Sequence, residues 1–185
     1  MTQLRMQMDN PLKPRALQKV VSETSTGASL KHLPVRNGPR PKVAPHPVPH
    51  RQLEQKIDES MRARLQGVFD QAQRNSEEKV FYRNSYFEKH TPALTLRTIR
   101  PDQGDACKSC GEIAHIHPSD GSMHMILSPA DASLVLEKGW GETHGLAGKA
   151  LGLPASYMLI YAPRDEDDLK VVSQILGASL DYMTG

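Results

Sequence analysis

Apolar residues recur every three or four positions in two stretches of the chain, and this spacing predicts two amphipathic helices. The first covers residues 52–75, with apolar positions at Leu53, Ile57, Met61, Leu65, Val68, Phe69 and Ala72. The second follows Pro163, where four consecutive acids at residues 165–168 suit the positive end of a helix dipole. A third helix is predicted over residues 129–138, because Ser128 and Pro129 are typical of a helix start and Gly139 of a helix end.

Other regions alternate between apolar and other residues with a period of two, which is typical of strands. Residues 80–82, 93–99 and 157–162 are predicted as single strands. Residues 113–127 are predicted as a hairpin whose arms read Ile-Ala-His-Ile-His and Met-His-Met-Ile-Leu. Residues 102–110 and 139–144 are predicted as loops, the second carrying the only tryptophan, Trp140.

The predicted hairpin has two faces of different chemistry. His115, His117 and His124 share one face in both registers that the turn allows. A four-residue turn at 118–121 sets His115 opposite His124, whereas a tight turn at 120–121 sets His117 opposite His124. The other face carries only apolar residues, namely Ala114, Ile116, Met123, Met125 and Leu127. Since four of the eight histidines fall within residues 111–144, this segment is the candidate site.

The order of predicted elements is helix, two strands, hairpin, helix, strand, helix. This order fits a two-layer α+β domain with an antiparallel or mixed sheet and its helices on one face. The face that bears the histidines then needs another cover. A proline-rich arm packed across the domain, together with the Trp140 loop, would supply it and leave a pocket between arm and sheet.

Charge and proline divide the 185 residues unevenly. Eight of the fourteen prolines lie in residues 1–50, where eight Lys or Arg residues face two acids, so this part is near +6 and the rest near −4. Residues 1–32 show no sustained period and are predicted to be a disordered arm, with residues 33–185 as the domain. Residues 33–50 contain six prolines and read as either a basic tail or a strap on the domain.

Several functional classes fit the composition poorly. No stretch approaches the roughly 18 apolar residues of a membrane span, and the first 30 residues lack a signal-peptide core, so a cytoplasmic protein is expected. The basic arm lacks interleaved aromatic residues, so no nucleic-acid partner is expected. Cys107 and Cys110 have the spacing of half a zinc site, which His115 and His117 could complete. A structural zinc site usually draws its second ligand pair from farther along the chain, so free thiols are expected.

Three histidines on one sheet face, with His144 on a nearby loop, fit three roles that the residues alone leave open. They can act as a base and hydrogen-bond donors, they can hold a divalent metal through His115, His117 and His124, or they can be a structural cluster.

Several longer motifs in the chain resemble those of a known family. The segments IAHIH, GWGETHGLAG, YAPRDEDD and ASLDYMT resemble the fungal luciferase family, and LPVRNGPRP and YFEKH extend the resemblance upstream to about residue 33. The resemblance makes the proline-rich arm part of the domain. Luminous members have Arg at the position of Thr143, so the resemblance does not imply light emission.

The resemblance implies an enzyme, an oxygenase or monooxygenase of secondary metabolism. Luminous members of the family oxygenate an enolised styrylpyrone, 3-hydroxyhispidin, with dioxygen. It therefore implies an enolisable aromatic or polyketide-like substrate, such as a hydroxypyrone or a phenol, and dioxygen as co-substrate. A non-oxidative lyase, hydrolase or isomerase, or a ligand-binding module, is the alternative. Carried over by position, the catalytic residues are His115, His117, His124, His144 and Arg164, and the substrate-binding residues are Trp140, Tyr161, His90 and His46.

Overall fold

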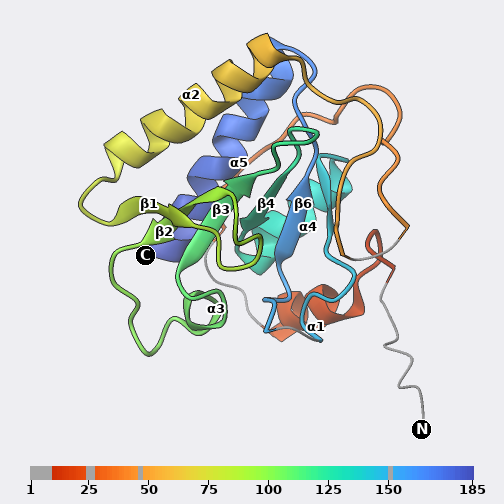
Figure 1. The fold of residues 1–185 in the computed structure, drawn as a ribbon. Helices are drawn as coiled ribbons and strands as arrows, with labels where there is room; N and C mark the ends of the chain where they lie inside the picture. The colour runs from red at the N-terminus through yellow and green to blue at the C-terminus, as the bar shows by residue number, and fades with distance from the viewer. Residues whose placement is uncertain (1–9, 24–27, 46–47, 150–151) are drawn as a thin grey trace, which may run out of the picture.

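A computed structural model describes residues 10–23, 28–45, 48–149 and 152–185. These residues form a six-stranded antiparallel sheet with the strand order β1-β2-β3-β4-β6-β5 (Figure 1). The strands are β1 (Val80–Asn84), β2 (Pro92–Leu96), β3 (Glu112–Ile116), β4 (Met123–Ile126), β5 (Gly141–Thr143) and β6 (Tyr157–Ile160). The predicted α+β class is confirmed, and of the two sheet types that were left open the antiparallel one is found.

The β3–β4 hairpin adopts the first of the two predicted registers. His115 lies opposite His124, and the backbone of His117 pairs with that of Ser122, so residues 118–121 form the turn. Gly121 has a φ of +80°, a value that L-residues rarely adopt, and the chain at Ile57 packs directly against it. The glycine thus allows both the turn and the close approach of another segment.

Three longer helices lie on or beside the sheet face that is opposite the hairpin histidines. They are α2 (Glu59–Asn75), α4 (Pro129–Glu137) and α5 (Glu166–Thr184). Helix α5 packs on β3 and β4, α2 packs on α5 and β1, and α4 contacts β5 (Figure 1). The predicted cap at Ser128 is present, and Asp165 caps α5 in the same way, since both side chains accept backbone N–H groups three residues on. Buried apolar residues of these helices and of the strands form one continuous core.

The helix predicted over residues 52–75 is wrong in its first seven residues. Helix α2 begins only at Glu59, with Asp58 as its N-cap, and Leu53 is 50% exposed. Gln55 has a φ of +54°, which a helix does not permit, and the backbone N–H of Gln52 donates to the side chain of Asp120 in the hairpin turn. A long-range contact with the turn therefore replaces the helix that the periodicity predicts.

Three further predictions need correction. Residues 15–23, predicted to be disordered, form helix α1 (Arg15–Glu23), whose Leu17 is buried and which packs on α4. The loop at 102–110 contains the short helix α3 (Gly104–Lys108). The loop at 139–144 contains β5, an edge strand paired with β6, where Gly141 lies so close to the Leu159 carbonyl that no side chain would fit.

The described part of the proline-rich arm contacts β5 and the loop before it. The indole N–H of Trp140 donates to the Pro34 carbonyl at 2.7 Å, the backbone N–H of Arg36 donates to Lys138, and Arg40 pairs with Glu142. No helix among the described residues is long and apolar enough to cross a membrane.

Candidate active site

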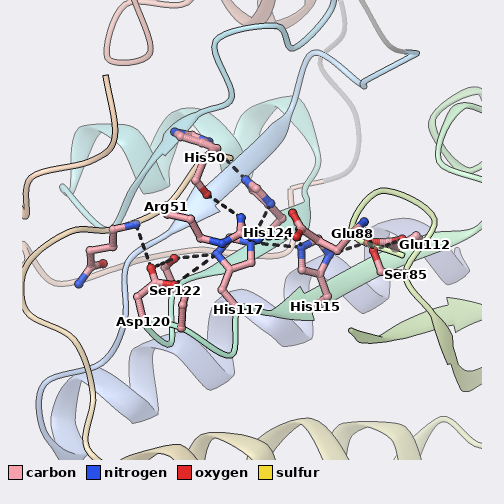
Figure 2. Close-up of polar contacts among 12 residues, drawn as sticks. His50, Arg51, Ser85, Glu88, Glu112, His115, His117, Asp120, Ser122 and His124 are labelled. Atoms are coloured by element: carbon pink, nitrogen blue, oxygen red, sulfur yellow. Dashed lines mark hydrogen bonds and ion pairs between the residues drawn. The ribbon is translucent and has the colours of Figure 1, made fainter. Parts of the chain in front are cut away.

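A row of side chains runs across four neighbouring strands on one face of the sheet. His115 of β3 lies opposite His124 of β4, which lies opposite Leu159 of β6, which lies opposite Glu142 of β5. His117 follows two residues after His115 and therefore shares its face. All three histidines are at most 3% exposed. The prediction that they share a face is confirmed, and Figure 2 shows their rings pointing toward one another.

The first histidine is oriented by a buried acid on its own strand. The Nδ1 of His115 lies 2.6 Å from the carboxylate of Glu112. That carboxylate also accepts the hydroxyl of Ser85 at 3.0 Å and the backbone N–H of Tyr86, so it acts as an acceptor toward all three groups. His115 must then carry its proton on Nδ1, which leaves a lone pair on Nε2.

The second histidine is oriented through the hairpin turn. The Nδ1 of His117 lies 2.8 Å from the hydroxyl of Ser122, and this hydroxyl donates to the carboxylate of Asp120. On the other side, the guanidinium of Arg51 lies 3.2 Å from Nε2 of His117. Because a guanidinium can only donate, that nitrogen must accept, and His117 also carries its lone pair on Nε2.

The third histidine is oriented by the arm. The Nε2 of His124 lies 3.3 Å from Nδ1 of His50, whose Nε2 lies 3.2 Å from the carboxylate of Glu142. When His50 donates to Glu142 through Nε2, its Nδ1 accepts from His124. This arrangement leaves the lone pair of His124 on Nδ1, the nitrogen that faces His117.

The three nitrogens that carry lone pairs converge. Nε2 of His117 lies 3.2 Å from Nε2 of His115 and 3.1 Å from Nδ1 of His124. A carboxylate oxygen of Glu88 joins them, and the four ligand atoms all lie within 4.8 Å of one another. Burial, and secondarily the neighbouring histidines, hold the pKa of His117 and of His124 well below the ordinary value, so both are neutral at neutral pH.

The far acid of this network is itself held ionised. Burial alone would raise the pKa of Glu142, but hydrogen bonds from His50, Arg40 and Tyr161 outweigh it and lower that pKa. The Tyr161 hydroxyl donates to Glu142 at 2.8 Å, and burial beside this carboxylate raises the pKa of the phenol. Glu142 therefore stays a hydrogen-bond acceptor toward His50.

Aromatic rings lie against the cluster on one side. Tyr157 stacks on His124 with ring centroids 4.6 Å apart, and Phe87 contacts Tyr157 at 5.0 Å. Burial, followed by the charges of Glu112 and Glu88, raises the pKa of Tyr157, which keeps its hydroxyl protonated. The cluster thus combines neutral imidazoles with apolar, flat neighbours.

The structure brings some predicted site residues to this cluster and not others. His144 is buried, and its ring meets that of His50 edge-on at 5.0 Å. Trp140 and Tyr161 lie one step farther out, where the guanidinium of Arg36 stands over both rings. Tyr161 is connected to the cluster through its hydrogen bond to Glu142, whereas Trp140 hydrogen-bonds to the arm.

The remaining predicted residues lie elsewhere. Arg164 pairs with Asp168 at the start of α5 and donates to the Asn37 carbonyl. His90 is exposed in the turn before β2. His46 lies outside the described residues.

The pocket predicted between the arm and the sheet is closed over the histidines. His115 and His117 have no exposed surface, and the side chains of His50 and Arg51 lie directly against the cluster (Figure 2). A cavity of about 580 Å³ lies instead between α2 and the start of α5, lined by Met61, Arg64 and Arg164 among others.

Sequence reasoning missed the groups that orient the cluster. These are His50, Arg51, Glu88, Glu112, Asp120, Ser122 and Glu142. Two signals were present, because Glu88 and Glu142 lie inside the YFEKH and GWGETHGLAG segments that carry the family resemblance. For the buried acids, the alternating pattern gave no signal, since an acid on a strand is ordinarily taken as solvent-facing.

Comparison with known proteins agrees with the geometry. Residues 111–179, which carry the hairpin histidines, match the family model described as Luciferase domain. The chain is 35% identical over 167 residues to a luciferase of Neonothopanus nambi, covering 84% of this chain and 62% of the relative. Luciferases of Armillaria gallica and Armillaria ostoyae are each 35% identical over 170 residues, with the same coverage.

The chain thus spans about 62% of the length of these curated relatives. No solved structure matches it. The histidine hairpin lies within the matched domain, and the similarity extends over most of the chain. The chain is therefore similar to the fungal luciferases over most of its length, and its residues 111–179 match the luciferase-domain family.

Proposed function

We propose that this protein is an oxygenase of the fungal luciferase type, which adds dioxygen to an enolised aromatic or polyketide-like small molecule such as a hydroxypyrone or a phenol. The observation that carries the proposal is the buried cluster of neutral imidazoles, whose lone pairs on His115 and His117 face one point. It lies in the domain shared with relatives that are named luciferases. The proposal does not require light emission.

The proposed chemistry needs little from the protein. A lone pair in the cluster takes the enol proton, and the resulting enolate carbon supplies both electrons for a new bond to one oxygen of dioxygen. The second oxygen takes up a proton, so that substrate and dioxygen combine into a hydroperoxide without another reductant. His117 and His124 stay neutral at neutral pH and therefore suit the first step, because an unprotonated nitrogen can accept.

The surroundings support the same chemistry. The guanidinium of Arg51 touches His117, so a positive charge stands where the substrate anion would form. Tyr157 and Phe87 offer flat apolar surface for a planar ring. Burial of the histidines keeps bulk water away from a carbanion. A substrate can reach the nitrogens only when His50 and Arg51 move aside, so binding is expected to displace residues 50–51.

The test is oxygen uptake over a panel of 3-hydroxyhispidin, related hydroxypyrones and phenols, using isotopically labelled dioxygen. The proposal predicts a substrate in the panel that consumes dioxygen in equal amount and yields a product carrying the label. A product formed without oxygen uptake would instead indicate a lyase, hydrolase or isomerase. Tight binding without any product across the panel would indicate a ligand-binding module.

A further inference from the structure

We propose that Nε2 of His115, Nε2 of His117, Nδ1 of His124 and a carboxylate oxygen of Glu88 form a site for one divalent first-row transition-metal ion. These four atoms are the only described group of at least three His, Cys, Asp or Glu ligands that converge in this way, with every pair within 4.8 Å. Three imidazoles and one carboxylate suit zinc, iron, cobalt or manganese.

The hydrogen-bond partners leave the facing nitrogens of His115 and His117 without protons. Glu112 takes the proton of His115, and Arg51 requires the facing nitrogen of His117 to accept. These two nitrogens lie 3.2 Å apart and cannot hydrogen-bond to each other, and a metal ion would take the place of the Arg51 N–H at His117. Burial of the cluster makes such a contact costlier than it would be in water.

The spacing of the nitrogens fits a shared metal. Two ligands bound at about 2.0–2.1 Å in a tetrahedral site lie about 3.3 Å apart. The observed separations are 3.2 Å between His115 and His117 and 3.1 Å between His117 and His124. Glu88 lies 3.9 Å from Nε2 of His115, so a small movement of this side chain would complete the fourth position.

The outer contacts follow the pattern that metal sites use. Metal-bound histidines ordinarily donate their other nitrogen to a carboxylate or to a group that leads to one, which fixes the ring and the lone pair. Here His115 donates to Glu112, His117 reaches Asp120 through Ser122, and His124 reaches Glu142 through His50. Each ring is thus aimed by a different acid.

The charges also leave room for a divalent cation. With the imidazoles left out of the count, the contacting groups include the four carboxylates of Glu88, Glu112, Asp120 and Glu142. Among the described residues, the guanidiniums of Arg40 and Arg51 oppose them directly. The cluster therefore has an excess of two negative charges, which one divalent ion would balance.

This inference deepens the proposed function, because a metal here would hold the enolate oxygen and lower the pKa of the enol. Its test nevertheless reads metal binding rather than turnover. Metal binding without oxygen uptake would support the site and contradict the proposed function, whereas full turnover by a protein that binds neither ion would do the reverse.

The experiment uses the untagged full chain, stripped with a chelator and titrated with Zn²⁺ by calorimetry and with Co²⁺ by visible absorption. We expect one equivalent of either ion to bind, with the absorption of nitrogen- and oxygen-ligated Co²⁺. His117→Ala and Glu88→Gln should weaken binding at least tenfold. His32→Ala and the double variant Cys107→Ser with Cys110→Ser should keep one equivalent, because these residues lie away from the cluster.

A second variant guards against misfolding of the histidine variant. Ser122→Ala keeps all four ligands and removes only the group that aims His117, so we expect about a 10–100-fold loss of affinity in a protein with a native circular dichroism spectrum. A wild-type chain that binds less than about a tenth of an equivalent of both ions would overturn the proposal. Equal affinity in wild type, His117→Ala and Glu88→Gln would overturn it as well.

Discussion

Each imidazole of the cluster hydrogen-bonds through one nitrogen to a group that leads to a buried acid, and this has a consequence for stability. Removing one ring takes one hydrogen bond away from its buried partner, Glu112, Ser122 or His50, at about 1–3 kcal/mol apiece. Removing His117 or His115 also relieves the contact between their facing lone pairs. Histidine variants should therefore be compared for folding before their activities are interpreted.

One residue-level prediction concerns Asp168, which pairs with Arg164 at the start of α5 and has a lowered pKa. Burial alone would raise that pKa, but hydrogen bonds from the Arg164 side chain and backbone outweigh it. The pair therefore stabilises the fold above the ordinary Asp pKa of about 3.9, and this stabilisation is lost as the pH falls through the lowered value. Asp168→Asn should cost about 1–2 kcal/mol at pH 7, measured by urea unfolding.

The same urea measurement has a matched control variant and an outcome that would contradict the prediction. Asp167→Asn changes an 88% exposed neighbour that pairs only with Lys170, and it should cost under about 0.5 kcal/mol. The difference between wild type and Asp168→Asn should shrink below pH 4 and vanish in stronger acid. A difference that stays constant from pH 7 to pH 2 would show that the carboxylate charge plays no part.

Two glycines give a second prediction, in which substitution by alanine changes stability in opposite directions. A Cβ on Gly121 would lie 2.3 Å from the Ile57 side chain at a φ of +80°, so Gly121→Ala should destabilise the protein by at least about 1 kcal/mol. Gly67 lies in α2 with open space around it, so Gly67→Ala should stabilise the protein by up to about 1 kcal/mol. Thermal melting checks both, and a stabilising Gly121→Ala would contradict the packing of residue 57 on the turn.

Among the elements, α1 shows how a segment without a long apolar period can still fold. Leu17 is 1% exposed and packs in the common core, and the hydroxyl and backbone N–H of Thr143 both donate to the Pro11 carbonyl. Tertiary contacts, rather than helix propensity, hold this short helix. Residues 10–23 therefore belong to the packed structure.

This packing gives an element-level prediction. Leu17→Ala should lower the free energy of unfolding by about 2–4 kcal/mol, because it leaves a cavity against α4. Gln18→Ala, one position along and exposed, should change it by less than about 0.5 kcal/mol. Equal stability of the two variants in urea would mean that α1 does not dock on the domain.

The elements also show what the sequence can predict. Residues 129–137 and 166–184 were predictable because caps and apolar period agree locally. Residues 52–58 were not, because Gln52 bonds Asp120, 68 positions away, and that contact overrides the period. In the site, alternation within one hairpin was enough to group His115, His117 and His124, but His50 is 74 positions from His124 and no local pattern joins them.

In the whole molecule, the sheet separates packing from chemistry. Helix α5 and the apolar residues of β3 and β4 fill one face, while the other face carries a polar row from β3 to β5. Residues 50–51 come from outside the sheet and close over that row. The buried histidine cluster lies in a domain that is similar to the fungal luciferases, and it is the place where the proposed function can be tested.

The most direct test of the histidine cluster as the active site is the rate of dioxygen consumption with 3-hydroxyhispidin and with any substrate found in the panel. The rate is measured for wild type and for His115→Ala, His117→Ala, His124→Ala and His32→Ala. Wild type and His32→Ala should consume dioxygen at equal rates. The three cluster variants should be slower by at least about 100-fold while keeping a native circular dichroism spectrum. Folded cluster variants that consume dioxygen as fast as wild type would contradict it.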